Sequence, residues 1–202
     1  MKKYIIGMLA AASCCVFLSG MIRAQLLVQN IAGKVLRFHI LANSDSSEDQ
    51  ELKLQVRDAV GVFLSEQMAG ASSLEESEAI VEENLAAIEE VAVSEVEAAG
   101  YAYPVTASLE TCVFPEKTYG AFTFPSGAYE ALRVVIGEGS GQNWWCVMYP
   151  NLCFAGSVCE VDAETGEKLQ AELTSEEYAA ILESGDYEVE FQILKFLNSF
   201  LE

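Results

Sequence analysis

The side chains best suited to chemistry gather in one short stretch of this chain. His39 is the only histidine, and Asn43, Ser44 and Asp45 follow it closely. A histidine, a serine and an aspartate could form the catalytic trio of a hydrolase. Three such residues at one strand end would hardly reach the required geometry, and no G-x-S-x-G motif is present. We therefore expect turn and helix-cap hydrogen bonds here, with His39 as a structural residue.

The same stretch resembles the start of a calcium-binding loop. Polar side chains occupy alternate positions, at Asn43, Asp45, Ser47 and Asp49. The glycine of an EF-hand loop is replaced by Glu48, and its final bidentate glutamate by Leu54. We therefore expect no metal, no cofactor and no catalytic residue. The alternative function is an envelope hydrolase or metal-dependent enzyme centred on His39 and Asp45.

A second region of interest surrounds two adjacent tryptophans. A glycine-rich loop at 137–141 follows an expected strand, but another strand follows the loop. A phosphate-binding loop needs a helix there, so we expect a hairpin-like connection instead. Trp144 and Trp145 in the next strand must point to opposite faces. Either both are covered within the domain, or one contributes to an interface.

Periodicity and turn residues predict the elements that position these residues. Strands are expected at 35–42, 105–113, 119–124, 129–136 and 144–149, and helices at 47–68, 74–99 and 175–183. Two weaker patterns indicate a strand at 188–191 and a helix at 193–201. Strands 119–124 and 129–136 are expected to pair as a hairpin. Arg37, His39 and Leu41 should share one face of the first strand.

The caps of the helices can also be predicted. Ser47 and Gln50 fit a capping box for the first helix, Gly100 a C-terminal cap for the second, and Thr174 an N-terminal cap for the third. The sum is an α+β fold. An N-terminal strand and two helices precede a mainly antiparallel sheet and a C-terminal helical part.

The N-terminus has the features of a membrane-targeting segment. Two lysines precede a run from Tyr4 to Gly20 that carries no charge, and Met21 and Ile22 lengthen the run. Residues 1–24 are therefore predicted to be a signal peptide or an uncleaved anchor. Residues 25–202 are long enough for a single extracytoplasmic domain with its own core.

The charge of the chain is strongly negative. The formal net charge is −20, and no basic residue lies between Arg57 and Lys117. Such a field repels phosphate backbones and anionic lipid heads. We therefore expect no nucleic-acid partner, and contact with the membrane only through the N-terminal segment.

Four of the six cysteines lie beyond the targeting segment, at Cys112, Cys146, Cys153 and Cys159. Disulfides can form in an exported chain, and four cysteines allow three pairings. Their spacing lacks the C-x-x-C pairs of zinc sites. Both disulfides and buried free thiols are compatible with this pattern.

Two blocks of sequence resemble one protein family. The first is Phe38-His39-Ile40-Leu41-Ala42-Asn43-Ser44-Asp45, continued by Asp49-Gln50, Leu52-Lys53 and Val56-Arg57-Asp58. The second includes Tyr119-Gly120, Tyr129-Glu130-Ala131-Leu132-Arg133, Asn143-Trp144-Trp145-Cys146-Val147 and Cys153. Together they resemble the stage II sporulation protein R family over most of residues 36–154. Cys159 has no counterpart in the resemblance.

The resemblance implies a signalling role in endospore formation. Members of this family are exported from the forespore into the space between forespore and mother cell. There they activate a membrane-embedded aspartic protease of the mother cell, which cuts the precursor of the early mother-cell sigma factor. On this basis, residues of both blocks are candidate contacts with the protease: His39, Asn43, Ser44, Asp45, Asp49, Arg57, Trp144 and Trp145.

Overall fold

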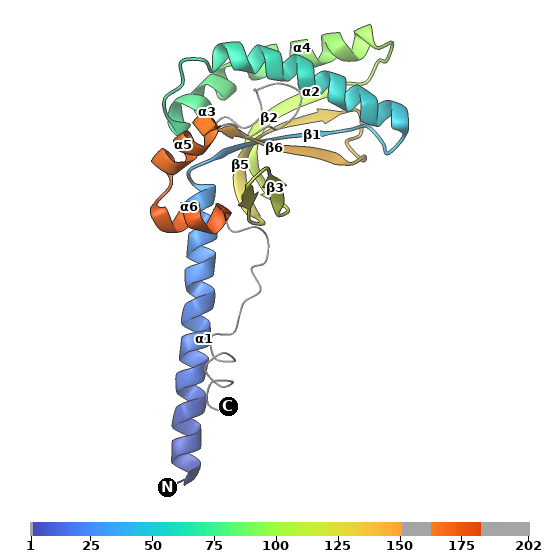
Figure 1. Ribbon diagram of the computed structural model, residues 1–202. Coiled ribbons are helices and arrows are strands. Elements are labelled where there is room, and N and C mark those ends of the chain that lie inside the picture. The colour runs from blue at the N-terminus through green and yellow to red at the C-terminus, as the bar shows by residue number, and fades with distance from the viewer. Residues whose placement is uncertain (1, 151–162, 183–202) are drawn as a thin grey trace.

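The computed structural model describes residues 2–150 and 163–182. A long helix leads into a four-stranded sheet, and three helices lie across one face of that sheet (Figure 1). The helices are α1 Lys2–Ala32, α2 Ser47–Gln67, α3 Leu74–Glu83, α4 Leu85–Ala98, α5 Ala163–Glu172 and α6 Ser175–Leu182. The strands are β1 Leu36–Leu41, β2 Val105–Phe114, β3 Lys117–Tyr119, β4 Phe122–Phe124, β5 Gly127–Ile136 and β6 Asn143–Tyr149. The strand and helix expected at 188–191 and 193–201 lie outside the described residues.

The four-stranded sheet has the order β2-β5-β1-β6. β5 pairs antiparallel with β2 and parallel with β1, and β6 pairs antiparallel with β1. The parallel pair is possible because the chain crosses over through α2, α3 and α4 before it returns to the sheet. The α+β class and the mainly antiparallel sheet are confirmed.

One predicted pairing is wrong. The expected strand at 119–124 is interrupted by a turn at Gly120, whose φ of 56° is left-handed, and its two halves pair with each other as β3 and β4. The expected hairpin with 129–136 therefore does not form. β5 instead lies inside the sheet between β2 and β1, and its side chains that face the helices, Leu132, Val134 and Ile136, are fully buried.

The main core lies between the sheet and the three helices. Phe38 and Ile40 of β1 and Leu132 and Val134 of β5 face the helices and are at most 1% exposed. The helices supply matching side chains at helical spacing, among them Leu52, Val56, Val60, Leu64, Val81, Ile88, Ala92 and Val96. Full burial of each aliphatic side chain stabilises the fold by roughly 1.5–3 kcal/mol.

The helix boundaries differ from the sequence prediction at two places. Ser46, not Ser47, caps α2, since its hydroxyl accepts the Asp49 N–H at 3.1 Å. The expected helix at 74–99 is divided at Asn84, whose side chain donates to the Ile80 carbonyl at 2.7 Å and so ends α3. Two other caps are confirmed. Gly100 has a φ of 87° just beyond α4, and Thr174 caps α6.

Helix α1 continues from the targeting segment into the domain. Its stretch Ser13–Ala32 is long and apolar enough to cross a membrane, with a mean hydropathy of 1.3, which is compatible with a signal or an anchor. The last turns pack on the sheet, where Ile31 is 1% exposed. The helix has no break at Ala24, so the predicted boundary at 24 is not an end of secondary structure.

Candidate functional site

The loop at 137–142, between β5 and β6, is bound to the end of β1. The main-chain carbonyl of Asn43 accepts hydrogen bonds from the N–H and the hydroxyl of Ser140, at 3.2 and 2.7 Å. The side-chain oxygen of Asn43 accepts the Glu138 N–H at 3.1 Å. Asn43 is thus the centre of a contact between two loops that lie almost 100 residues apart in the sequence, since Asn43 and Ser140 are separated by 97 positions.

This loop needs glycines because its main chain approaches Asn43 and Ser44 closely. A Cβ atom at Gly137 would overlap the Asn43 side chain, and one at Gly141 would overlap the Ser44 carbonyl. Gly137 also has a φ of 60°, which favours glycine. The loop is therefore shaped to pack against β1. The expected hairpin-like connection is wrong, because β1 lies between β5 and β6 in the sheet and the loop crosses the end of β1. As expected, a strand and not a helix follows the loop.

Asp45 fastens the other end of the same loop. Its carboxylate accepts the Gln142 N–H at 2.7 Å, and the Gln142 carbonyl accepts a hydrogen bond from Lys53 at 2.9 Å. Lys53 also donates to Gln50 at 2.6 Å. Burial lowers the pKa of Lys53. The exposed carboxylate of Asp45 thus already has a structural partner.

Asp49 is the buried acceptor of this region. Its carboxylate accepts hydrogen bonds from the Ser44 hydroxyl at 2.5 Å and from the Asn43 amide at 2.9 Å, and the residue is only 4% exposed. These two bonds hold the pKa of Asp49 below its usual value. The negative charge also lies in the first turn of α2, where the helix dipole favours it.

The structure therefore brings four predicted site residues together, but mainly with one another. Asn43, Ser44, Asp45 and Asp49 join β1, α2 and the loop at 137–142 through hydrogen bonds. The expected turn and cap bonds are thus present around this strand end. Their capacity to contact a partner stays a prediction.

His39 lies apart from these residues, on the opposite face of the sheet from the three helices. Its ring is stacked on Trp145, with centroids 4.9 Å apart and planes 9° from parallel, and is also 5.2 Å from the Phe114 ring. The residue is 5% exposed, and neither ring nitrogen has a hydrogen bond of good geometry among the described residues. Burial lowers the pKa of His39 to about 4, although the Asn143 side chain lies close enough to raise it in part, so the ring is neutral at pH 7.

The two tryptophans point to opposite faces, as predicted. Trp144 meets the edge of Phe38 at 5.6 Å on the helix side, and the guanidinium of Arg57 lies 5.3 Å from its ring. Trp145 lies on the other face, 4.7 Å from Phe114. Both indoles are half-buried, so each retains surface that a partner could cover.

Arg37 is a buried residue that the sequence did not single out. It is 0% exposed and lies inside four aromatic rings, with the Phe114 and Tyr129 centroids at 4.4 and 4.8 Å. Its Nε donates to the Cys146 carbonyl at 2.9 Å, and its Nη2 to the Tyr119 hydroxyl at 3.0 Å. Burial lowers the pKa of Arg37. The charge is held by ring faces and two neutral acceptors, and it fixes the β3–β4 hairpin to the sheet.

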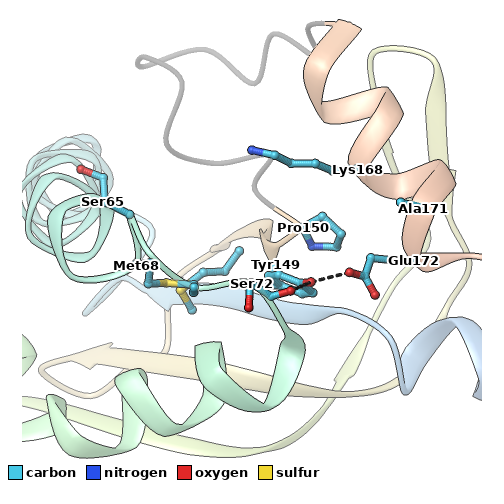
Figure 2. A pocket seen from close by; sticks show the side chains of 11 residues that line it. Ser65, Met68, Ser72, Tyr149, Pro150, Lys168, Ala171 and Glu172 are labelled. Carbon is cyan, nitrogen blue, oxygen red and sulfur yellow. Dashed lines mark hydrogen bonds between the residues drawn. The ribbon is translucent and has the colours of Figure 1, made fainter.

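A cavity of about 270 Å³ lies at the far end of β6, between α2 and α5 (Figure 2). The Tyr149 hydroxyl lies 2.6 Å from Glu172 and 3.3 Å from the Ser72 carbonyl. Burial, with the bond to Glu172, raises the pKa of Tyr149. The Tyr149–Glu172 bond ties α5 to the sheet. None of the predicted site residues lines this cavity.

The cysteines differ in state. Cys146 in β6 is disulfide-bonded. Cys112 in β2 is a free, half-buried thiol whose pKa is raised by burial. Cys153 and Cys159 lie outside the described residues, so the pairing stays a prediction.

Known proteins have sequences similar to the one that builds this arrangement. Residues 32–158 match the family model described as stage II sporulation protein R. Stage II sporulation protein R of Bacillus subtilis (strain 168) is 34% identical over 163 residues, which cover 78% of this chain and 73% of that relative. No solved structure matches the chain. The family match spans all of the four-stranded sheet and its covering helices, and the chain belongs to the stage II sporulation protein R family, whose name assigns it a role in sporulation.

Proposed function

We propose that this chain is an exported signal of endospore formation that activates a membrane-embedded aspartic protease of the mother cell. The protease then cuts the precursor of the early mother-cell sigma factor. The observation that carries the proposal is the family match over residues 32–158. The apolar helix that precedes the matched region is compatible with export or anchoring.

The geometry favours a binding role for the candidate site. Asn43, Ser44 and Asp49 use their polar atoms to bind one another. His39 is neutral at pH 7 and stacked between aromatic rings, and it forms no hydrogen bond with Asp45. In the described ranges, 2–150 and 163–182, no three His, Cys, Asp or Glu side chains lie together as metal ligands would. The arrangement therefore offers less support for the alternative enzyme centred on His39 and Asp45.

Activation by a binding protein requires a difference in affinity. The signal must bind the active, self-cleaving state of the protease more tightly than the inactive state, and the population then shifts toward the active state. A rigid surface suits this task, because little conformational entropy is lost when it binds. The sheet and its bound loop provide such a surface.

Co-expression in a non-sporulating host tests the proposal. The sigma-factor precursor, the candidate protease from the same organism and the full-length exported chain are combined, and each is omitted in turn. We expect precursor cleavage only when the protease and this chain are both present. Cleavage that is equal without this chain would remove the activating role.

The same assay tests the alternative function. His39→Ala removes the only histidine of the chain. An enzyme centred on His39 would lose its activity completely, even where the protein is folded and bound to its partner. A folded His39→Ala protein that still promotes cleavage would exclude that enzyme.

A further inference from the structure

One half of the sheet face opposite the three helices is not covered by any described element. Across this half, His39 is paired in register with Arg133 and Trp145, and Leu41 with Val135 and Asn143. We call these six residues the open sheet face. The described α1, α6 and β3–β4 hairpin lie under the other half of the sheet (Figure 1).

The boundary of the open sheet face is sharp. In the next row of the same face, Arg37 is paired with Ala131 and Val147, and all three residues are 0% exposed. Within the open sheet face, by contrast, Leu41, Val135 and Trp145 are only half-buried. A partner that covers these apolar side chains removes them from water, which favours its binding.

The His39 and Asn143 side chains of the open sheet face hold polar atoms that are closed to solvent. Among the described residues, neither ring nitrogen of His39 nor the side-chain oxygen of Asn143 has a hydrogen bond of good geometry, although the two side chains interact with each other. His39 is 95% buried, since its exposed fraction is 5%. These polar atoms are therefore out of a partner's reach, and the surface that a partner can cover is the apolar surface of Leu41, Val135 and Trp145.

The charge of the open sheet face indicates the kind of partner. The whole chain carries a net charge of −20, but this face holds Arg133, whose guanidinium is 3.2 Å from the Glu110 carboxylate at the rim. The face is therefore a nearly neutral area on an acidic molecule. Anionic lipid heads are repelled by the surrounding charge, whereas an uncharged apolar segment is not.

We propose that the open sheet face docks a short, uncharged, apolar polypeptide segment of the membrane partner. Apolar side chains of the segment cover Leu41, Val135 and Trp145. The identity of the partner rests on the proposed function, whereas the position of the surface does not. Asn43 and Asp45 then support binding indirectly, because they hold the loop at 137–142 in place. They are not part of the main binding surface.

The test compares two valine substitutions in the same sheet. Val135→Asp places a charge in the open sheet face, whereas Val113→Asp places it on β2, where Val113 is 78% exposed and belongs to neither core cluster. Circular dichroism of both full-length variants checks the fold. In the co-expression assay, we expect Val135→Asp to reduce precursor cleavage by about tenfold or more, and Val113→Asp to change it by less than about twofold.

Photo-crosslinking makes the test independent of cleavage. A photoreactive amino acid at position 135 or 113 of the full-length chain is illuminated with membrane vesicles that contain the protease, or with vesicles that lack it. We expect a crosslink to the protease from position 135 and none from position 113. A crosslink from position 135 to lipid, equal crosslinks from both positions, or none from position 135 would overturn the docking proposal. A specific crosslink without stimulated cleavage would leave the docking surface in place and remove the activating role.

Discussion

The ring of His39 lies flat against the indole of Trp145, with the two centroids 4.9 Å apart. The contact crosses from β1 to β6, and Phe114 closes it from β2 at 5.2 Å from the histidine. A neutral imidazole fits this aromatic stack, whereas an imidazolium would lose its hydration there. The stability of the fold therefore depends on the protonation state of His39.

Acid should weaken this fold through His39. The pKa of His39 in the folded state is about 4, lower than the ordinary 6.5 because of burial, so the unfolded chain binds more protons between these values. The stability due to neutral His39 is complete above pH 6.5 and decreases as the pH falls toward 4. His39→Phe keeps the ring but does not titrate. We expect its free energy of unfolding to fall less over this range, by on the order of 2 kcal/mol.

Denaturant unfolding at several pH values measures this difference. The other titrating groups are the same in both proteins, so subtraction isolates His39. Parallel pH curves for wild type and His39→Phe would show that the histidine is not held neutral by its environment.

The close packing of the loop against β1 predicts a glycine effect. A methyl group at Gly141 would overlap the main-chain carbonyl of Ser44, so Gly141→Ala must displace backbone. We expect a loss of at least about 2 kcal/mol in unfolding free energy. Gly61→Ala is the control, because Gly61 lies inside α2 with open space around it. This control should stabilise the protein by about 0.5–1 kcal/mol. If Gly141→Ala raised the unfolding free energy as the control does, the close packing of Gly141 against Ser44 would be contradicted.

The N-cap of α2 gives a prediction that separates two neighbouring serines. Ser46 accepts the Asp49 N–H, whereas the Ser47 hydroxyl donates only to the exposed Glu48. Ser46→Ala should lower the unfolding free energy by about 1 kcal/mol, and Ser47→Ala by no more than a few tenths. Thermal unfolding followed by circular dichroism measures both. A larger loss of unfolding free energy for Ser47→Ala than for Ser46→Ala would instead support the capping box predicted from the sequence.

Much of the fold could be predicted from sequence because its signals are local. Helical spacing predicted α2, an apolar β-branched run predicted β1, alternation predicted β2, and Gly100 marked the end of α4. The break at Asn84 was missed because the apolar stripe continues across it from α3 to α4. A side chain that bonds back to Ile80 leaves no trace in that periodicity.

The pairing of the strands was harder to predict because it depends on distant contacts. The sequence 119–136 looked like a simple hairpin, yet β5 pairs with β1 and β2. The nearly continuous aliphatic run Ala131–Ile136, interrupted only by Arg133, is a sequence signal that could have suggested the central position of β5. The candidate site was predicted as a cluster at the end of β1, and the structure adds the loop at 137–142 that binds to it.

Arg37 was not recognised as special, because alternation alone cannot tell whether a polar strand residue is covered. Its guanidinium is surrounded by the rings of Phe114, Tyr119, Phe124 and Tyr129, which come from β2, β3, β4 and β5. Arg37→Ala leaves a cavity among these rings and removes the donor to the Cys146 carbonyl. We expect it to cost at least about 3 kcal/mol of unfolding free energy.

Two further variants separate the packing of Arg37 from its charge. Arg37→Met fills a similar volume without the charge, and it should cost clearly less than Arg37→Ala, because packing is kept and no buried charge remains. Arg133→Ala is the control on the same sheet face, where the ion pair with Glu110 is part-exposed, and it should change stability by less than about 1 kcal/mol. Denaturant unfolding of the three variants gives the comparison. If Arg37→Met were as damaging as Arg37→Ala, the charge and its two hydrogen bonds, not the filled volume, would be what holds the β3–β4 hairpin on the sheet.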